Sequence, residues 1–194
     1  MQTNKIIGSK VKTIRESRNL TIDEVSERSG VSKIQIERIE DDLEIPSLAP
    51  LIKIARALGV RLGTFLDDNN ELGPVVSRAK DIVDKNTIRF TGDSTPMRKH
   101  MEYHSLSQGK AGRHMESFLI DILSDEENEY TLSTHEGEEF IFVLEGVVEI
   151  MYGKDVYTLE KGDSIYYDSI VAHHVHAAKD KAPAKIIGVV YTPC

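Results

Sequence analysis

The 194-residue sequence is poor in cysteine, aromatic residues and long apolar segments. Its only cysteine is Cys194, and a single cysteine cannot form an internal disulfide, so the fold does not depend on an oxidising compartment. No apolar run approaches the roughly 18 residues of a membrane span. The first ten residues also lack the apolar core of a signal peptide. We therefore expect a folded cytoplasmic protein.

The charge is distributed unevenly along the chain. Residues 1–66 carry 11 lysines and arginines against 9 acidic residues, a net charge of +2, whereas residues 67–194 carry 13 against 23, a net charge of −10. All seven histidines and all seven tyrosines lie at or beyond position 100. Such a shift predicts two domains with different tasks. Residues 67–74 are polar, acidic and end in Gly-Pro, which predicts a linker between domains at 1–66 and 75–194.

The first domain has the apolar spacing and the capping signals of short helices. Thr21 and Glu24 have the spacing of a capping box, and Gly30 ends the helix that follows them. Ser32 opens the next helix. Ser47, which follows a proline, is the expected N-cap of a further helix. This pattern predicts an all-α bundle.

Two short capped helices around a Gly-Val turn are typical of a helix-turn-helix. The sequence resembles the phage-repressor (XRE-type) helix-turn-helix family in five segments: Val11–Arg18, Gly30–Ser32, Ile39–Glu40, Pro46–Leu48 and Ala57–Val60. The resemblance covers about the first third of the chain and implies that the second helix of the pair enters the major groove. By position on the family pattern, the resemblance implies that Ser32, Lys33, Ile34, Glu37 and Arg38 face DNA.

Different DNA contacts follow from the chemistry of these side chains. Lys33 and Arg38 reach guanine edges or phosphates, and Ile34 contacts a thymine methyl group. Thr21 and Ser47 stand at helix N-termini, where backbone N–H groups bind phosphate. The partner that this domain implies is a double-stranded operator.

The chain departs from the family after the second helix of the pair. The family usually has a glycine there, often near basic residues, whereas this chain has Glu40-Asp41-Asp42. An acidic run at this place repels phosphate and weakens non-specific binding. A helical bundle that retains the fold as a dimerisation module without binding DNA is therefore the alternative.

After position 100 the sequence changes to short runs of β-branched and aromatic residues between turns. The strands expected are 101–106, 117–123, 140–144, 147–152, 156–159, 164–167, 171–176 and 186–191. Many short strands at this spacing predict an antiparallel sandwich or barrel. The fold class is thus α + β in separate domains. The strand at 140–144 is apolar at every position, which predicts cover on both of its faces.

Two motifs of the second domain resemble those of cupins. His135, Glu139 and Gly146 have the H-x3-E-x6-G spacing of the first cupin motif, and Gly162–His173 is similar to the second. Together with the flanking strands, the resemblance covers most of residues 75–194. It implies a jelly-roll barrel whose interior holds a divalent metal and a small ligand.

The metal ligands that the resemblance implies are His135, Glu139 and His173. Ser133 stands where the full family pattern has a further histidine. Two imidazoles and one carboxylate suit Fe, Zn, Ni, Mn or Co, and they are the ligand set of mononuclear iron enzymes. The alternative is structural: a histidine satisfied within the sheet, and a glutamate at a strand edge that discourages sheet-to-sheet pairing.

Four further residues are candidates for ligand binding. Tyr103 lies on an expected strand, and Ser133 lies just upstream of the metal motif. Lys110 and Arg113 form a basic cluster in an acidic domain, which suits a small anion such as a carboxylate or a phosphate. A solvated loop is the alternative for this cluster.

Two functions follow from these resemblances. The first is a transcriptional regulator that binds operator DNA as a homodimer and whose cupin domain binds a small-molecule effector, through a metal or directly. The second is an enzyme, because the order of domains and the reduced ligand set also resemble hydroxypropylphosphonate epoxidase, with Fe(II) held by His135, Glu139 and His173. A metal-free cupin scaffold for protein contacts is a third reading.

Overall fold

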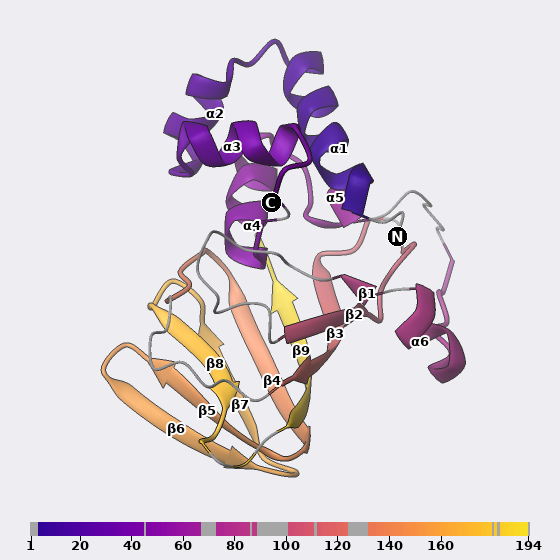
Figure 1. Cartoon of the computed structure of the whole chain (residues 1–194), viewed down its shortest axis with the longest axis vertical. Helices are drawn as coiled ribbons and strands as arrows, with labels where there is room; N and C mark the ends of the chain where they lie inside the picture. The colour runs from indigo at the N-terminus through magenta and orange to yellow at the C-terminus, as the bar shows by residue number, and fades with distance from the viewer. Residues whose placement is uncertain are drawn as a thin grey trace.

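The protein consists of a helical domain that lies against one end of a two-sheet β-sandwich (Figure 1). The computed structural model describes residues 4–44, 46–66, 73–85, 87–88, 101–110, 112–123, 132–179, 181 and 183–193. Residues 67–72 of the expected linker and Cys194 lie outside the described residues. The predicted fold class, an all-α domain followed by an antiparallel β domain, is confirmed. No described helix is long and apolar enough to cross a membrane.

Five helices build the first domain around one apolar core. They are α1 (Asn4–Ser17), α2 (Ile22–Ser29), α3 (Lys33–Glu40), α4 (Leu48–Ala57) and α5 (Gly63–Leu66). One residue from each of the first four helices and the residue that ends α4 are fully buried: Val11, Val25, Ile36, Leu51 and Leu58. The core therefore uses the apolar positions whose helical spacing is visible in the sequence.

The turn between α2 and α3 forms as its capping signals predict. The hydroxyl of Thr21 accepts from the N–H of Glu24, and the carboxylate of Glu24 accepts from the N–H of Thr21. Gly30 adopts φ 69°, a left-handed conformation that favours glycine, at the end of α2. Ser32 then caps α3 by accepting from the N–H of Gln35. These local bonds fix the angle between the two helices.

A buried ion pair joins α1 to the end of α3. Arg15 makes two hydrogen bonds to the carboxylate of Glu40, at 2.7 and 2.8 Å. The side chain of Glu40 is 3% exposed, so its charge is compensated inside the domain. Of the acidic run at the end of α3, Asp41 and Asp42 alone are exposed to solvent.

The second domain begins with α6 (Ala79–Lys85), which the sequence did not predict, and continues in strands. The strands are β1 (Thr87–Ile88), β2 (Met101–Ser105), β3 (Met115–Ile122), β4 (Glu138–Glu145), β5 (Val147–Tyr152), β6 (Asp155–Glu160), β7 (Ser164–Asp168), β8 (His173–Ala177) and β9 (Ala184–Tyr191). The eight strands predicted from the sequence are those from β2 to β9, with ends within two residues. β1 and α6 escaped prediction because both are short and lack a repeated apolar pattern.

The strands form two antiparallel sheets. One has the order β1-β2-β3-β9-β4-β7, and the other has the order β6-β5-β8. Their buried side chains alternate along the strands, as with Ile141 and Val143 on β4. Phe140 and Phe142 on the other face of β4 are half-buried, so this strand is less covered on that face than its apolar sequence predicts. Cross-strand register places Glu139 of β4 opposite Tyr167 of β7.

The helical domain contacts the β-sandwich mainly through α4 and α5, which lie between the other helices and the strands in Figure 1. Arg56 of α4 forms an ion pair with Glu136, in the turn before β4. Arg61 is hydrogen-bonded to His114, just before β3. Gly63 at the start of α5 packs against Arg113. The arrangement of the two domains therefore depends on specific polar contacts.

Candidate metal centre

Two side chains four residues apart and a third from farther along the sequence meet between the two sheets. His135 lies in the turn before β4, Glu139 is on β4 and His173 begins β8. One ligand atom of each lies within 4.8 Å of those of the other two. The Nε2 atom of His135 is 2.8 Å from Oε1 of Glu139, and Nε2 of His173 is 3.5 Å from the same oxygen. The structure thus brings together the three residues that the cupin motifs indicate.

The backbone around His135 is held by a turn that requires glycine. Gly137 has φ 113°, and a Cβ atom there would collide with a backbone oxygen of β9. The N–H of His135 donates to the carbonyl of Ser169, and the N–H of Ser169 donates to the carbonyl of Gly137. Ser133 and His173 exchange a further pair of backbone hydrogen bonds. These bonds tie the turn that carries one histidine to the strand that carries the other.

The orientation of both imidazole rings is set by backbone carbonyls. The Nδ1 atom of His135 is 3.1 Å from the carbonyl oxygen of Glu136, and Nδ1 of His173 is 2.8 Å from that of Val171. A carbonyl oxygen only accepts, so each Nδ1 carries a proton. In the neutral rings, both Nε2 lone pairs then face the carboxylate of Glu139, which is also an acceptor. A cation shared by the three groups removes this repulsion, which is the arrangement of metal-binding histidines.

Tyr167 of β7 completes the surroundings of Glu139. Its hydroxyl donates a hydrogen bond of 2.6 Å to Oε2, the carboxylate oxygen that does not face the histidines. Burial by itself raises the pKa of Glu139, but donation from the Tyr167 hydroxyl and from the protonated, imidazolium forms of His135 and His173 outweighs it and holds that pKa far below its ordinary value. Burial and the Glu139 charge raise the pKa of Tyr167. The tyrosine therefore remains a donor, and the glutamate remains an anion at neutral pH.

The donor set fits a divalent transition metal. Imidazole nitrogen suits Fe, Zn, Ni and Co, and a single carboxylate adds the oxygen ligand that Fe and Mn accept. Both histidines are buried, and Glu139 is largely buried. Three protein ligands leave coordination positions open for a small molecule. Two backbone carbonyls and the Tyr167 hydroxyl provide the outer contacts that orient the ligands.

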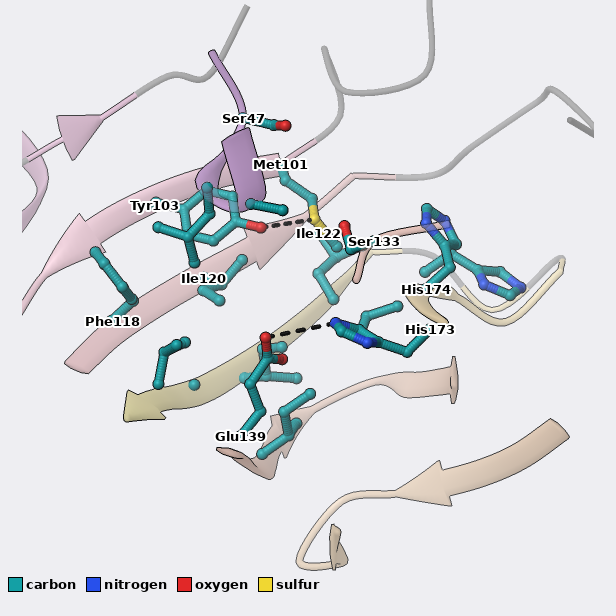
Figure 2. Close-up of a pocket in the computed structure, with 18 of the residues that line it drawn as sticks. Ser47, Met101, Tyr103, Phe118, Ile120, Ile122, Ser133, Glu139, His173 and His174 are labelled. Carbon is teal, nitrogen blue, oxygen red and sulfur yellow. Dashed lines mark hydrogen bonds and ion pairs between the residues drawn. The ribbon is translucent and has the colours of Figure 1, made fainter. Parts of the chain in front are cut away.

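The triad faces a cavity of about 100 Å³ inside the sandwich. Figure 2 shows Glu139 and His173 at its floor and Tyr103, Met101 and Ser47 toward the opposite side. Its walls are mostly apolar and come from β2, β3, β4, β8 and β9; they include Met101, Phe118, Ile120, Ile122, Ile141, Val175, Ile186 and Val190. A cavity of this size suits a molecule no larger than about a benzene ring.

The four predicted ligand-binding residues fall into two groups. Tyr103 and Ser133 line the cavity. Arg113 lies outside it, where it forms a buried ion pair with Glu116 at 2.8 Å and packs against the helical domain. Lys110 is half-buried in the same segment, and its carbonyl accepts from Arg113. Arg113 thus contributes to the contact between the domains, and neither residue of the basic cluster is among the described residues that line the cavity.

The predicted DNA-reading positions lie at the start and along one side of α3. Ser32, Lys33, Ile34 and Arg38 are exposed, and Glu37 is half-buried. Ile34 is 70% exposed, an unusual position for a large apolar side chain and one that suits contact with a base methyl group.

Acidic side chains hold both cations of this surface. Lys33 forms an ion pair with Asp23 at 2.9 Å, and Arg38 forms one with Glu44 at 3.0 Å. The hydrogen bond from Lys33 to Asp23 raises the pKa of the Lys33 ammonium. Phosphate groups would have to displace these carboxylates to reach the two cations.

Comparisons with known proteins match both halves of this description. A helix-turn-helix family profile matches residues 11–65, and a cupin-domain profile matches residues 123–190. The uncharacterised HTH-type transcriptional regulator y4dJ of Sinorhizobium fredii is 35% identical over 60 residues, which are 31% of this chain and 78% of that protein. This chain belongs to the XRE-type helix-turn-helix regulators.

Two full-length comparisons extend the likeness over both domains of this helix-turn-helix regulator. The HTH-type transcriptional regulator SutR of Escherichia coli is 24% identical over 169 residues, 87% of this chain and 85% of that protein. The crystal structure of an HTH_3-family transcriptional regulator from Vibrio cholerae is 25% identical, with a TM-score of 0.70 over 99% of this chain and 98% of that one.

One enzyme also resembles this XRE-type regulator in sequence. The (S)-2-hydroxypropylphosphonic acid epoxidase of Streptomyces wedmorensis is 27% identical over 156 residues, 74% of this chain and 73% of the enzyme. Its iron(II) form has a TM-score of 0.52 at 22% identity, which shows a shared fold. The order of the two domains is therefore common to regulators and to an enzyme.

Two residues at the N-termini of helices in this regulator have different surroundings. Thr21 is exposed on the surface of the helical domain, as a phosphate-binding residue must be. Ser47 is 7% exposed and lines the cavity of the cupin domain. The cupin domain thus covers Ser47 in this structure, at the place where the sequence predicts a phosphate contact.

The sequence analysis of this regulator missed Tyr167 and the start of α4 as parts of the site. Tyr167 lies six residues before His173 within the second cupin motif, so its position was a usable signal. Its role depends on the register that sets it opposite Glu139, which no local pattern reveals. No motif in the sequence indicates that the start of α4 lines the cavity, because it reaches the cavity through packing between the domains.

Proposed function

We propose that this helix-turn-helix regulator binds operator DNA through α3 and that a small molecule in its cupin cavity modulates that binding. The observation that carries the proposal is the shared wall of the cavity: the first residues of α4, which belong to the helical domain, line it together with the triad residues. A ligand in the cavity therefore contacts both domains. Such a ligand can shift the population of arrangements that are competent to bind DNA.

DNA contact is supported by the exposed surface of α3. Ser32, Lys33 and Arg38 offer hydrogen-bond donors there, and Ile34 offers an exposed apolar group. The burial of Glu40 against Arg15 removes one of the three charges that would repel phosphate at this end of α3. A single short helix gives limited affinity, so we propose a homodimer that reads two half-sites about one helical turn apart.

The proposed effector site uses the triad to hold a divalent metal. His135, Glu139 and His173 would bind the ion, and Tyr167 would keep Glu139 in position. When bound, the metal would supply open coordination positions for a ligand with oxygen or nitrogen donors. Its identity would be Fe, Zn, Ni, Mn or Co, which elemental analysis of the purified protein distinguishes.

A short route connects this site with the helical domain. Glu136 follows the metal-binding residue His135 directly, and its carboxylate is paired with Arg56 of α4. A ligand that moves the turn at His135 therefore also acts on the contact between domains. The size of this coupling is the ratio of operator affinities with and without the effector.

The test is the affinity of full-length protein for the DNA upstream of its own gene, measured by fluorescence anisotropy at several salt concentrations. Two variants, Lys33→Gln and Arg38→Gln, should each weaken binding and reduce the slope of log affinity against log salt by about one, because each removes a phosphate contact. Lys154→Gln removes an exposed cation of the cupin domain and is the matched control. Affinity that is unchanged by both α3 variants, or that is absent, contradicts the proposal.

An enzyme of the mononuclear iron type is the second candidate, and the chemistry of the triad favours it. Two histidines and one carboxylate are the ligand set of such enzymes, and the 27%-identical relative is an epoxidase. Bound iron would supply the site for oxidant activation, while Tyr103 and Ser133 would contact the substrate. Oxygen consumption by the iron-loaded protein with 2-hydroxypropylphosphonate, lost in His173→Ala, would favour the enzyme over the regulator.

A further inference from the structure

The N-terminal end of helix α4 is built into the cavity of the other domain. Ser47, Leu48 and Ala49 line the cavity together with Tyr103 and the triad. Figure 2 shows Ser47 on the side of the cavity occupied by Tyr103 and Met101, away from Glu139 at the floor. The cavity thus has two polar ends, one made by the metal ligands and one made by the helical domain.

The side chain of Ser47 makes no hydrogen bond to any described residue, and its own helix lacks one of the two usual capping donors. An N-cap serine normally accepts from the N–H of the second or third helical residue. The third residue of α4 is Pro50, which has no N–H, and Ser47 makes no capping hydrogen bond. No other hydrogen bond to its side chain exists among the described residues, although the residue is 93% buried. Because Ser47 lines the cavity, a ligand there can supply the partner that this hydroxyl lacks.

Two backbone donors stand beside this hydroxyl. The N–H groups of Leu48 and Ala49 belong to the first turn of α4, where no carbonyl of the helix can accept from them. The aligned peptide dipoles of a ten-residue helix place roughly half a positive charge at this end. Together with the Ser47 hydroxyl, they form a set of donors with a partial positive charge.

The walls of the cavity decide which ligand this end suits. The described lining consists of apolar side chains, hydroxyl groups, imidazoles and the carboxylate of Glu139. The positive charge that it offers at the α4 end is the partial charge of the helix, which matches a singly charged carboxylate better than a phosphate dianion. Apolar walls and a volume of about 100 Å³ then suit a short hydrocarbon chain behind that carboxylate.

We propose that the cavity binds a short-chain organic acid, with its carboxylate on Ser47 Oγ and on the N–H groups of Leu48 and Ala49. This inference rests on the proposed effector role of the cavity, and it names the class of effector. The helical domain itself supplies the carboxylate subsite, so the bound acid joins α4 to the cupin strands. A change in the position of α4 breaks these contacts, which makes ligand affinity depend on the arrangement of the two domains.

The proposal is tested on full-length, EDTA-dialysed protein without DNA, so that neither metal binding nor operator binding enters the result. Acetate, butyrate and hexanoate, and the matching alcohols, are titrated by calorimetry. We expect butyrate to bind at least about tenfold more tightly than butanol. Ser47→Ala should weaken butyrate binding by at least about tenfold and should leave the affinity for butanol unchanged. The amide signals of Leu48 and Ala49 should shift in ¹⁵N spectra on addition of butyrate.

Matched variants separate a carboxylate subsite from a general effect on the helical domain. Ser47→Thr retains the hydroxyl and should retain most of the butyrate affinity, and Thr21→Ala removes another N-cap hydroxyl of the same domain and should leave it unchanged. Three results would overturn the proposal. They are equal affinity for butyrate and butanol, no binding of any acid at concentrations up to about 10 mM, and unaltered butyrate binding in Ser47→Ala. Tighter binding of inorganic phosphate than of butyrate also overturns it. Failure of the DNA experiment leaves each of these results intact.

Discussion

The hydroxyl of Tyr167 is the residue-level feature that most shapes the candidate metal centre. It occupies the one carboxylate oxygen of Glu139 that the histidines do not face, at 2.6 Å. Its raised pKa keeps it protonated, so it donates throughout the neutral range. The hydrogen bond leaves the other carboxylate oxygen of Glu139, Oε1, available to a metal on the side of His135 and His173.

Tyr167→Phe should lower metal affinity by about tenfold or more, because loss of an outer hydrogen bond lets the carboxylate rotate away from the metal position. Competition with a chelating dye for Co(II) measures the change. Tyr166→Phe is the neighbouring control, since the Tyr166 hydroxyl is bonded to Glu138, outside the triad. Equal losses in the two variants would show that the outer contact to Glu139 has no special role.

At the scale of single helices, α2 and α4 begin with the same kind of residue but in different states. Thr21 is a complete capping residue, bonded in both directions with Glu24. Ser47 is an N-cap by backbone conformation alone, with φ −62° and ψ 170° and no side-chain bond. Pro50 contributes to the difference, because it removes the third-residue N–H, which is the donor that Thr21 uses in α2.

Thr21→Ala should therefore destabilise the helical domain by about 1 kcal/mol, whereas Ser47→Ala in the absence of ligand should change stability by less than about 0.5 kcal/mol. Urea unfolding followed by circular dichroism measures both values. A loss in Ser47→Ala as large as that in Thr21→Ala would mean that Ser47 caps α4 after all.

The capping box also predicts how stability depends on pH. Hydrogen bonds from the backbone N–H and the hydroxyl of Thr21 lower the pKa of Glu24 below its ordinary value. Its stabilising contribution is therefore complete above the ordinary pKa near 4.5 and is lost as pH falls toward the lower folded-state pKa. Unfolding between pH 6 and 3 should show a shallower decline below pH 4.5 in Glu24→Gln than in the wild type. Parallel curves would contradict this assignment.

At the scale of the whole molecule, the two domains meet through a small glycine. A Cβ atom at Gly63 would lie 2.6 Å from a guanidinium nitrogen of Arg113 and 2.8 Å from a carboxylate oxygen of Glu116. These two side chains form a buried ion pair, so they have little freedom to move aside. The close approach of α5 to the β-sandwich thus depends on the missing side chain.

Gly63→Ala should destabilise the packing between the domains by about 1–2 kcal/mol, because the added methyl group overpacks a buried contact. Gly73→Ala places a methyl group where nothing lies within 4 Å and is the matched control. Differential scanning calorimetry should show a lower transition temperature in Gly63→Ala, for one domain or for both. The transition temperatures of Gly73→Ala should be those of the wild type. Identical thermograms for the two variants would show that the interface relaxes freely around Gly63.

Local chemistry made much of this molecule predictable. The capping box at Thr21, the left-handed turn at Gly30 and the alternation along β3 are each decided by a few neighbouring residues. The identities of His135, Glu139 and His173 were also accessible, since they lie in motifs with fixed spacing. The anion site expected at Lys110 and Arg113 stays a prediction, and no local pattern revealed that Arg113 pairs with Glu116 beside the helical domain.

The sequence by itself determined the two domains, their helices and strands, and which three side chains meet as a candidate metal centre. Only the tertiary structure decided that Tyr167 faces Glu139 and that Ser47 at the start of α4 lines the cupin cavity. The physical reason is the range of the interactions. Caps, turns and strand alternation depend on residues a few positions apart, whereas the cavity is closed by packing between segments more than fifty residues apart, whose contacts no local pattern specifies.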